Sequence, residues 1–143
     1  MSLRWPAWVL VGLLLAGCGG GGPVTLASGE SAPYGIALDG TNVYWATFNG
    51  GTVEECAKAG CGGSPTTLAS GLMSPGQVAV DASDVYWTEF GAHRVAKCAL
   101  GGCSSPAVLA TGQAGAFAIA LDSQYVYWGN QTGGQVEGIV KDP

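Results

Sequence analysis

Short apolar runs separated by turns rich in glycine, aspartate and asparagine recur along most of the chain. Two clear runs are Ile36–Leu38 and Val43–Thr47, which are joined by the turn Asp39–Asn42. Short runs bounded by turn signals are typical of β-strands. Beyond the N-terminal segment, no stretch shows the apolar spacing of an amphipathic helix. The pattern therefore predicts an all-β fold.

One unit is repeated three times along the chain. Its marker is Val-Tyr-Trp, which ends at Trp45, Trp87 and Trp128 and so recurs after 42 and then 41 residues. A period near 40 with Trp and Gly at fixed places is typical of a four-stranded β-propeller blade. We expect a repeat domain over 24–143, with repeats at about 26–67, 68–108 and 109–143.

Each repeat supplies candidates for four antiparallel strands. In the first repeat these are the two runs above, then about Val53–Ala57, and last Thr66–Ala69. A further strand is expected at Val24–Ala27, and the third repeat ends after its third strand. The sequence thus predicts twelve strands, or three blades offset by one strand, an arrangement with which propellers often close their ring.

The segment Tyr86-Trp87-Thr88-Glu89 resembles the YWTD repeat of six-bladed propellers in the low-density-lipoprotein-receptor family. The whole unit is similar to bacterial TolB-like and NHL-like six-bladed propellers. Copies one and three depart from the YWTD pattern, with Ala46-Thr47 and Gly129-Asn130. The resemblance implies a ring of six blades, of which three blades are half. Closed propellers have about 4–8 blades, so we expect that one chain does not close a ring alone. The alternatives are a homodimer that completes a six-bladed ring, a fragment of a longer product, and an open array with exposed edges.

The N-terminus has the pattern of an export signal. Arg4 precedes the apolar run Ala7–Ala16, which is too short to cross a bilayer but suits a signal peptide. The following Leu15-Ala16-Gly17-Cys18 resembles the lipobox of bacterial lipoproteins, which implies cleavage before Cys18 and lipid attachment to it. We expect a signal peptide over 1–17 and a lipidated Cys18 with a glycine-rich tether over 18–23.

The expected location is the bacterial cell envelope, with the protein held to the membrane by its N-terminal lipid. Gly19 after Cys18 implies the outer membrane if the organism is Gram-negative. The alternative is an ordinary secretory signal in which Cys18 has no such role.

Four further cysteines form two equivalent pairs, Cys56 with Cys61 and Cys98 with Cys103. Each pair flanks the turn between the third and fourth strands of its blade. In an oxidising compartment this spacing predicts two local disulfides, whereas a zinc ion held by four thiolates is the alternative. Ile139 stands where the third repeat would carry the first cysteine, so a blade does not require the disulfide.

Charge narrows the range of partners. Ten acidic residues face five basic ones, and removal of Arg4 with the signal peptide leaves a net charge of about −6. An acidic surface repels phosphate backbones, so we expect no nucleic-acid partner.

The residues repeated in every copy have structural interpretations. The aspartates are expected to accept turn N–H groups, with a calcium site as the alternative. The Tyr-Trp pairs are expected to pack between blades, with a ligand cage as the alternative. These residues are Asp39, Asp81, Asp122, Tyr44, Trp45, Tyr86, Trp87, Tyr127 and Trp128.

No catalytic constellation is apparent. His93 is the only histidine, and no nucleophile motif accompanies it. We expect a binding or scaffold module for a protein or glycan, with no catalytic residue, metal or cofactor. The alternatives are a lactonase-like, metal-dependent propeller hydrolase and a truncated propeller fragment without activity.

Overall fold

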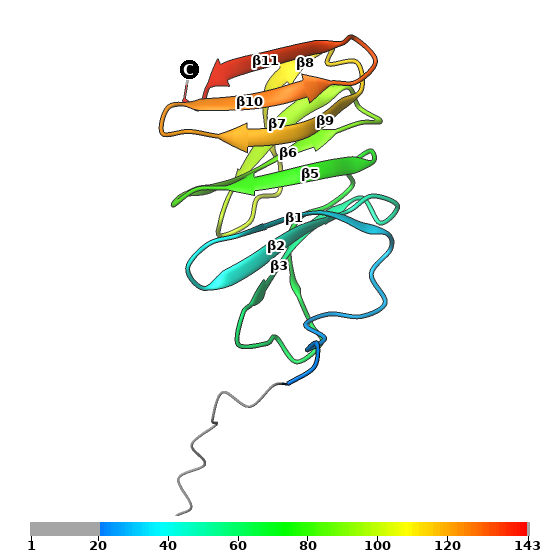
Figure 1. The fold of residues 1–143 in the computed structure, drawn as a ribbon, viewed down its shortest axis with the longest axis vertical. Coiled ribbons are helices and arrows are strands. Elements are labelled where there is room, and N and C mark those ends of the chain that lie inside the picture. Colours follow the sequence, from blue (N-terminus) through cyan, green and yellow to red (C-terminus); the bar gives the residue numbers. More distant parts are fainter. Residues whose placement is uncertain (1–20, 143) are drawn as a thin grey trace, which may run out of the picture.

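The computed structural model describes residues 21–142, so the expected signal peptide and Cys18 lie outside the described residues. Within them, eleven strands form three antiparallel sheets stacked along the long axis of the molecule (Figure 1). Blade 1 comprises β1 (Pro33–Leu38), β2 (Asn42–Thr47), β3 (Thr52–Ala57) and β4 (Thr66–Ala69). Blade 2 comprises β5 (Pro75–Val80), β6 (Asp84–Glu89), β7 (Arg94–Ala99) and β8 (Ala107–Thr111). Blade 3 comprises β9 (Ala116–Leu121), β10 (Tyr125–Asn130) and β11 (Gln135–Val140). The all-β prediction is confirmed.

Tight turns join the second and third strands of each blade. Gly51 and Gly134 hold equivalent turn positions with φ of 67° and 66°, in the left-handed region that glycine enters without steric cost. His93 holds this position in blade 2 with φ of 52°. The lone histidine is therefore part of a turn whose backbone conformation is the same in all three blades.

The first strands of the blades lie next to one another, β1 against β5 and β5 against β9 (Figure 1). A Cβ atom added to Gly35 on β1 would lie only 2.4 Å from the carbonyl oxygen of Gly76 on β5. Any larger residue at this position would push the two strands apart. Glycine thus sets how closely blades 1 and 2 approach along their inner edge.

The hydrophobic core is divided between the two blade interfaces. Tyr44, Val53 and Trp87 are buried between blades 1 and 2, and Tyr86 and Trp128 are buried between blades 2 and 3. A single blade has no closed core of its own, so each sheet depends on its neighbours for the burial of its apolar face.

The strand predicted at Val24–Ala27 is wrong. These residues run along the outside of blade 1 without strand pairing, and Val24 is 83% exposed. A strand requires a neighbour that accepts and donates its backbone hydrogen bonds, and none of the described strands lies beside this segment in that way. The described residues therefore contain eleven strands, and blade 3 has three.

Candidate functional site

Four aromatic side chains meet along the edge of the stack where the inner strands begin. Tyr34 on β1 and Phe117 on β9 pack edge to face, with ring centroids 5.2 Å apart. Phe48 follows β2 and lies 5.8 Å from the Tyr34 ring, and Phe90 follows β6 and lies 6.5 Å from Phe48. This aromatic cluster, defined as Tyr34, Phe48, Phe90 and Phe117, combines rings from all three blades.

A glycine in the middle blade allows the cluster to form. Tyr34 and Phe117 hold equivalent positions in blades 1 and 3, and Gly76 holds that position in blade 2. A Cβ atom at Gly76 would lie 3.0 Å from Thr88 Oγ1 and 3.7 Å from the Phe117 ring. Thr88 Oγ1 also donates a 2.8 Å hydrogen bond to the Phe117 carbonyl oxygen, which ties β9 to β6. The rings of the outer blades therefore meet across the middle blade on a fixed backbone.

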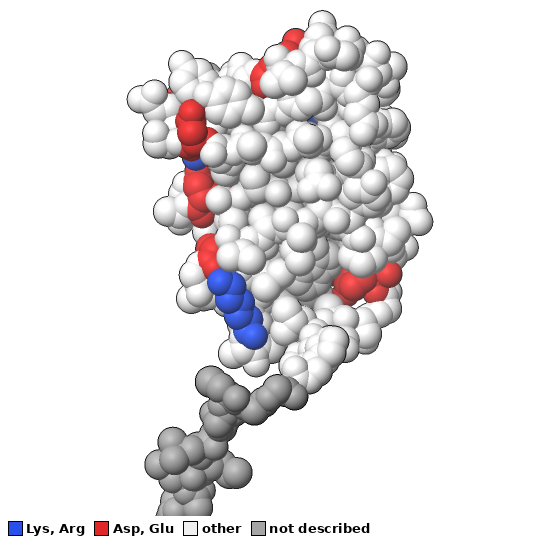
Figure 2. Space-filling model, in the orientation of Figure 1, with Lys and Arg blue, Asp and Glu red and all other residues white. Residues whose placement is uncertain are grey.

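The surface around the aromatic cluster is apolar and open. Tyr34 is 52% exposed and Phe90 is 36% exposed. Met73 lies on the adjoining loop, where its carbonyl oxygen accepts a bond from Gly91, and it is 60% exposed. The three inner strands contain no charged residue, and the middle of the face in Figure 2 is uncharged. Exposed apolar surface contributed by several elements is typical of an interaction site.

The repeat pattern of the sequence does not by itself reveal this cluster. Phe48 and Phe90 each stand three positions after the repeated Trp. An alignment of the three copies could therefore have found both phenylalanines. It could not have shown that they meet Tyr34 and Phe117, because this depends on how the blades stack.

The repeated aspartates lie along the opposite edge of the stack, one in each blade, and organise its turns. Asp39 Oδ1 accepts 2.7 Å bonds from the backbone N–H groups of Thr41 and Asn42, and Asp39 Oδ2 accepts a 2.7 Å bond from the Tyr44 hydroxyl. The same set recurs for Asp81 with Ser83, Asp84 and Tyr86, and for Asp122 with Gln124, Tyr125 and Tyr127. Acidic side chains follow one another along this edge in Figure 2.

These bonds change the acidity of both partners. The hydrogen bond from the Asn42 N–H, followed by that from Tyr44, lowers the pKa of Asp39 well below its usual range. Burial and the neighbouring Asp39 carboxylate raise the pKa of Tyr44 to about 12. The carboxylate therefore stays ionised and the phenol stays protonated, as a bond that connects the turn to β2 requires.

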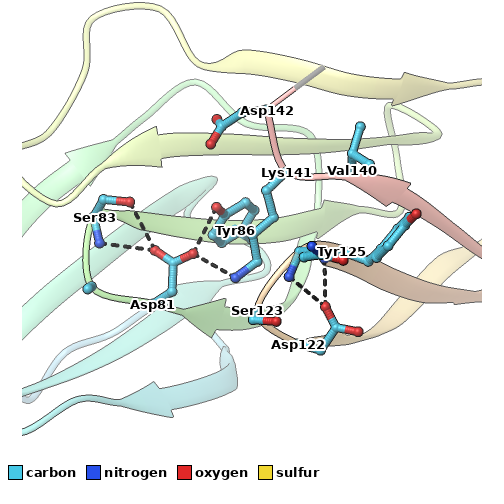
Figure 3. A pocket seen from close by; sticks show the side chains of 11 residues that line it. Asp81, Ser83, Tyr86, Asp122, Ser123, Tyr125, Val140, Lys141 and Asp142 are labelled. Atoms are coloured by element: carbon cyan, nitrogen blue, oxygen red, sulfur yellow. Dashed lines mark hydrogen bonds and ion pairs between the residues drawn. The ribbon is translucent and has the colours of Figure 1, made fainter.

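A cleft of about 750 Å³ lies between the turns of blades 2 and 3 (Figure 3). Lys141 Nζ lies 2.8 Å from Asp81 Oδ2 and 5.6 Å from the centroid of the Tyr86 ring. Burial would raise the pKa of Asp81, but the bonds from Lys141 and the turn lower it below the usual value. Lys97 bridges Asp142 at 2.5 Å. Since these charges already have partners within the protein, the cleft is less suited to a ligand than the aromatic cluster.

The repeated tryptophans are buried, and each donates its indole N–H to a side chain. In blade 1 the acceptor is Glu30, at 3.3 Å from Trp45 Nε1, and in blade 3 it is Gln113, at 2.8 Å from Trp128 Nε1. Glu30 and Gln113 hold equivalent positions in the loops that lead into β1 and β9.

Blade 2 uses a different acceptor for the indole N–H of its repeated tryptophan. Leu72 stands at the equivalent loop position, and Trp87 Nε1 donates instead to Glu89 at 3.1 Å. Glu89 is fully buried and accepts bonds from Arg94 Nε at 2.8 Å and from the backbone of Met73 at 3.1 Å. In the sequence, Glu89 stands out only as part of the repeat, and its pairing with Arg94 is seen only in the structure.

The predicted disulfides are present, between Cys56 and Cys61 and between Cys98 and Cys103. Their formation excludes the four-thiolate zinc site in this state. Residues 21–142 contain no group of three or more side chains placed to hold a metal ion. His93 is exposed on its turn. No helix in the described part of the chain is long and apolar enough to cross a membrane.

The stacked antiparallel blades, two with four strands and one with three in the described residues, lie side by side along their first strands and define the fold as a β-propeller segment. No protein-family model and no curated protein matches the chain. Among solved structures, a chain of a nidogen/laminin complex aligns with a TM-score of 0.71 and 24% identity, over 79% of this chain and 44% of that one. A streptogramin B lyase aligns with a TM-score of 0.66 and 17% identity, over 79% and 39%. An inactive virginiamycin B lyase from Staphylococcus aureus, crystallised with quinupristin, aligns with a TM-score of 0.68 and 14% identity, over 82% and 41%. The chain thus spans less than half the length of these three structures, and the likeness shows the fold.

Proposed function

We propose that the chain is an exported β-propeller module that binds a protein segment through the aromatic cluster. The observation that carries the proposal is the meeting of four aromatic rings from three blades at one open edge of the stack, where the inner strands begin. Rigid aromatic side chains provide a large contact area at low entropic cost and are enriched at protein interfaces. An apolar peptide segment suits this surface because no charged residue of the inner strands requires a counter-charge.

A random peptide library displayed on phage tests this binding. Peptides rich in aromatic and aliphatic residues should be enriched on the protein. They should bind the double variant Tyr34→Ser/Phe90→Ser at least about tenfold more weakly, which corresponds to a loss of about 1.4 kcal/mol. The control is Val108→Ser/Tyr125→Ser, which changes residues 44% and 38% exposed elsewhere and should bind as the wild type does.

Two results would contradict the proposal. One is the absence of enriched peptides, or peptides that bind both double variants equally. The other is binding to a glycan array that is lost in the variant Tyr34→Ser/Phe90→Ser, which would show that the partner is a carbohydrate.

We also propose that the module is anchored through a lipid on Cys18, at the outer membrane of a Gram-negative envelope. The support is the segment Leu15-Ala16-Gly17-Cys18, together with two disulfides that suit an oxidising compartment. In a bacterial host, labelled palmitate should enter the wild type and not Cys18→Ser, and Gly19→Asp should move the protein to the inner-membrane fraction. Equal labelling of Cys18→Ser would exclude this anchor.

A further inference from the structure

Blade 3 differs from the other two blades in the pairing of its third strand. In blades 1 and 2 the third strand pairs with a fourth, β3 with β4 and β7 with β8. In the described residues β11 has β10 on one side and no strand on the other. Val136 on β11 is 84% exposed, whereas the equivalent Val53 and Val95 are fully buried. Within residues 21–142, blade 3 therefore has a strand edge that no other strand pairs with, and an exposed apolar residue beside it.

Residues 24–30 show the complementary feature at the other end of the stack. The Leu68 carbonyl oxygen of β4 accepts a 3.1 Å bond from the Cys103 N–H of the next blade, and the equivalent Leu26 carbonyl oxygen lies 3.5 Å from Sγ of Cys61, the blade 1 counterpart of Cys103. The bond from Trp45 to Glu30 likewise repeats the bond from Trp128 to Gln113. Residues 24–30 therefore lie where the fourth strand of a preceding blade, and its following loop, would contact blade 1.

The faces at the two ends also match. Tyr127 on the outward face of blade 3 is 38% exposed, whereas the equivalent Tyr44 and Tyr86 are covered by the next blade and are 1% exposed. On the outward face of blade 1, Ile36 is 67% exposed, whereas the equivalent Val78 is 5% exposed. The ends thus present the two halves of an interface that occurs twice within the chain.

We propose that residues 24–27 of one copy add to β11 of a second copy as the fourth strand of its blade 3. The equivalent pairs Val53 with Ala69 and Glu54 with Thr67 predict Val136 opposite Ala27 and Glu137 opposite Thr25. Addition of a strand satisfies the open backbone edge, and docking of the end faces buries the apolar side chains. Residues 24–27 and β11 of one chain lie at opposite ends of the stack (Figure 1), so the donor is a second copy. Two such exchanges about a twofold axis join two copies.

Native mass spectrometry of the exported protein in mild detergent tests the assembly. The wild type should have the mass of two chains. Val136→Lys places a charge on the proposed interface and should give single chains. Val108→Lys, at a residue 44% exposed on β8, is the matched control and should remain a dimer. A monomeric wild type, a filament, or a dimer unaffected by Val136→Lys would overturn the proposal.

Cysteine cross-linking tests the register. Ala27→Cys and Val136→Cys, made in separate chains and mixed under mild oxidation, should give a covalent dimer that reducing agent dissolves, because directly opposed residues on paired strands are close enough to form a disulfide. Ala27→Cys mixed with Val108→Cys should give none. Equal cross-linking of both mixtures would exclude the proposed pairing. Neither experiment depends on the aromatic cluster, so this proposal and the proposed peptide binding can fail separately.

Discussion

Blades 2 and 3 share the Val-Tyr-Trp marker, and their first three strands occupy nearly the same positions within the repeat. Their side chains nevertheless have different environments. Blade 2 is covered on both faces, and its Tyr86 and Val95 are almost completely buried. Blade 3 is covered on one face only, and the equivalent Tyr127 and Val136 are 38% and 84% exposed. A blade sequence therefore specifies a sheet, whereas burial of that sheet depends on the neighbouring blades.

The two blades also differ in the group that accepts the hydrogen bond from the indole N–H of the buried tryptophan. Blade 3 uses the neutral Gln113 from a loop, whereas blade 2 uses the ionisable Glu89 from its own β6 together with Arg94 from β7. Glu89 is fully buried, and the Arg94 side chain is 30% exposed. The enclosed blade therefore contains a carboxylate that water cannot reach and that depends on protein donors.

Glu89→Ala is expected to have the largest effect among single substitutions. It removes the acceptor for Trp87, for Arg94 and for the Met73 N–H, and should lower the free energy of unfolding by about 3–4 kcal/mol. The blade 3 counterpart Asn130→Ala should cost about 1–2 kcal/mol, because Gln113 still accepts the Trp128 N–H. Urea unfolding followed by tryptophan fluorescence measures both. Equal losses would show that the buried carboxylate has no special part in blade 2.

Val95→Ala should cost about 2–3 kcal/mol, because it removes buried methyl groups and leaves a cavity. Val136→Ala at the equivalent position should cost little in single chains, since this side chain is exposed there. Urea unfolding over a range of protein concentrations separates the two cases. If a second copy covers β11, the cost of Val136→Ala should grow with concentration while that of Val95→Ala stays constant. A cost for Val136→Ala that is independent of concentration would contradict coverage by a second copy.

Local features were predictable from the sequence, and features that join blades were not. The third strand expected at about Val53–Ala57 is observed at Thr52–Ala57, because turns and alternation within one blade define it. The strand expected at Val24–Ala27 failed, because strand pairing requires a partner edge that this stack does not place there. The aromatic cluster was missed for the same kind of reason, since Tyr34 and Phe117 are far apart in the chain and meet only where Gly76 leaves room.

Removal of a disulfide should cost less than these core changes. Cys98→Ala/Cys103→Ala opens a small loop, for which the entropic loss is about 2 kcal/mol. Cys56→Ala/Cys61→Ala should cost somewhat less, because Cys98 and Cys103 pack in the core between blades 1 and 2, whereas the blade 1 pair faces residues 24–30. Urea midpoints with and without reducing agent measure both effects. If reducing agent left the wild-type midpoint unchanged, the disulfides would not contribute to stability.

Glu54→Gln should have the smallest effect, and its sign should be opposite. Glu54 lies on β3 of blade 1, and Ala96 holds the equivalent position in blade 2. The Glu54 Oε2 atom is buried and has no hydrogen-bond partner among the described residues. Burial raises the pKa of Glu54, and the neighbouring Glu30 raises it further, so the ionised form costs stability above the folded-state pKa. Glu54→Gln should therefore stabilise the protein by about 0.5 kcal/mol at pH 7. This gain should disappear as the pH falls below the ordinary value of 4.5, where Glu54 is protonated in both states. Glu55→Gln on the same strand is the control, and a loss of stability in Glu54→Gln at pH 7 would show that the charge is needed at this end of the stack.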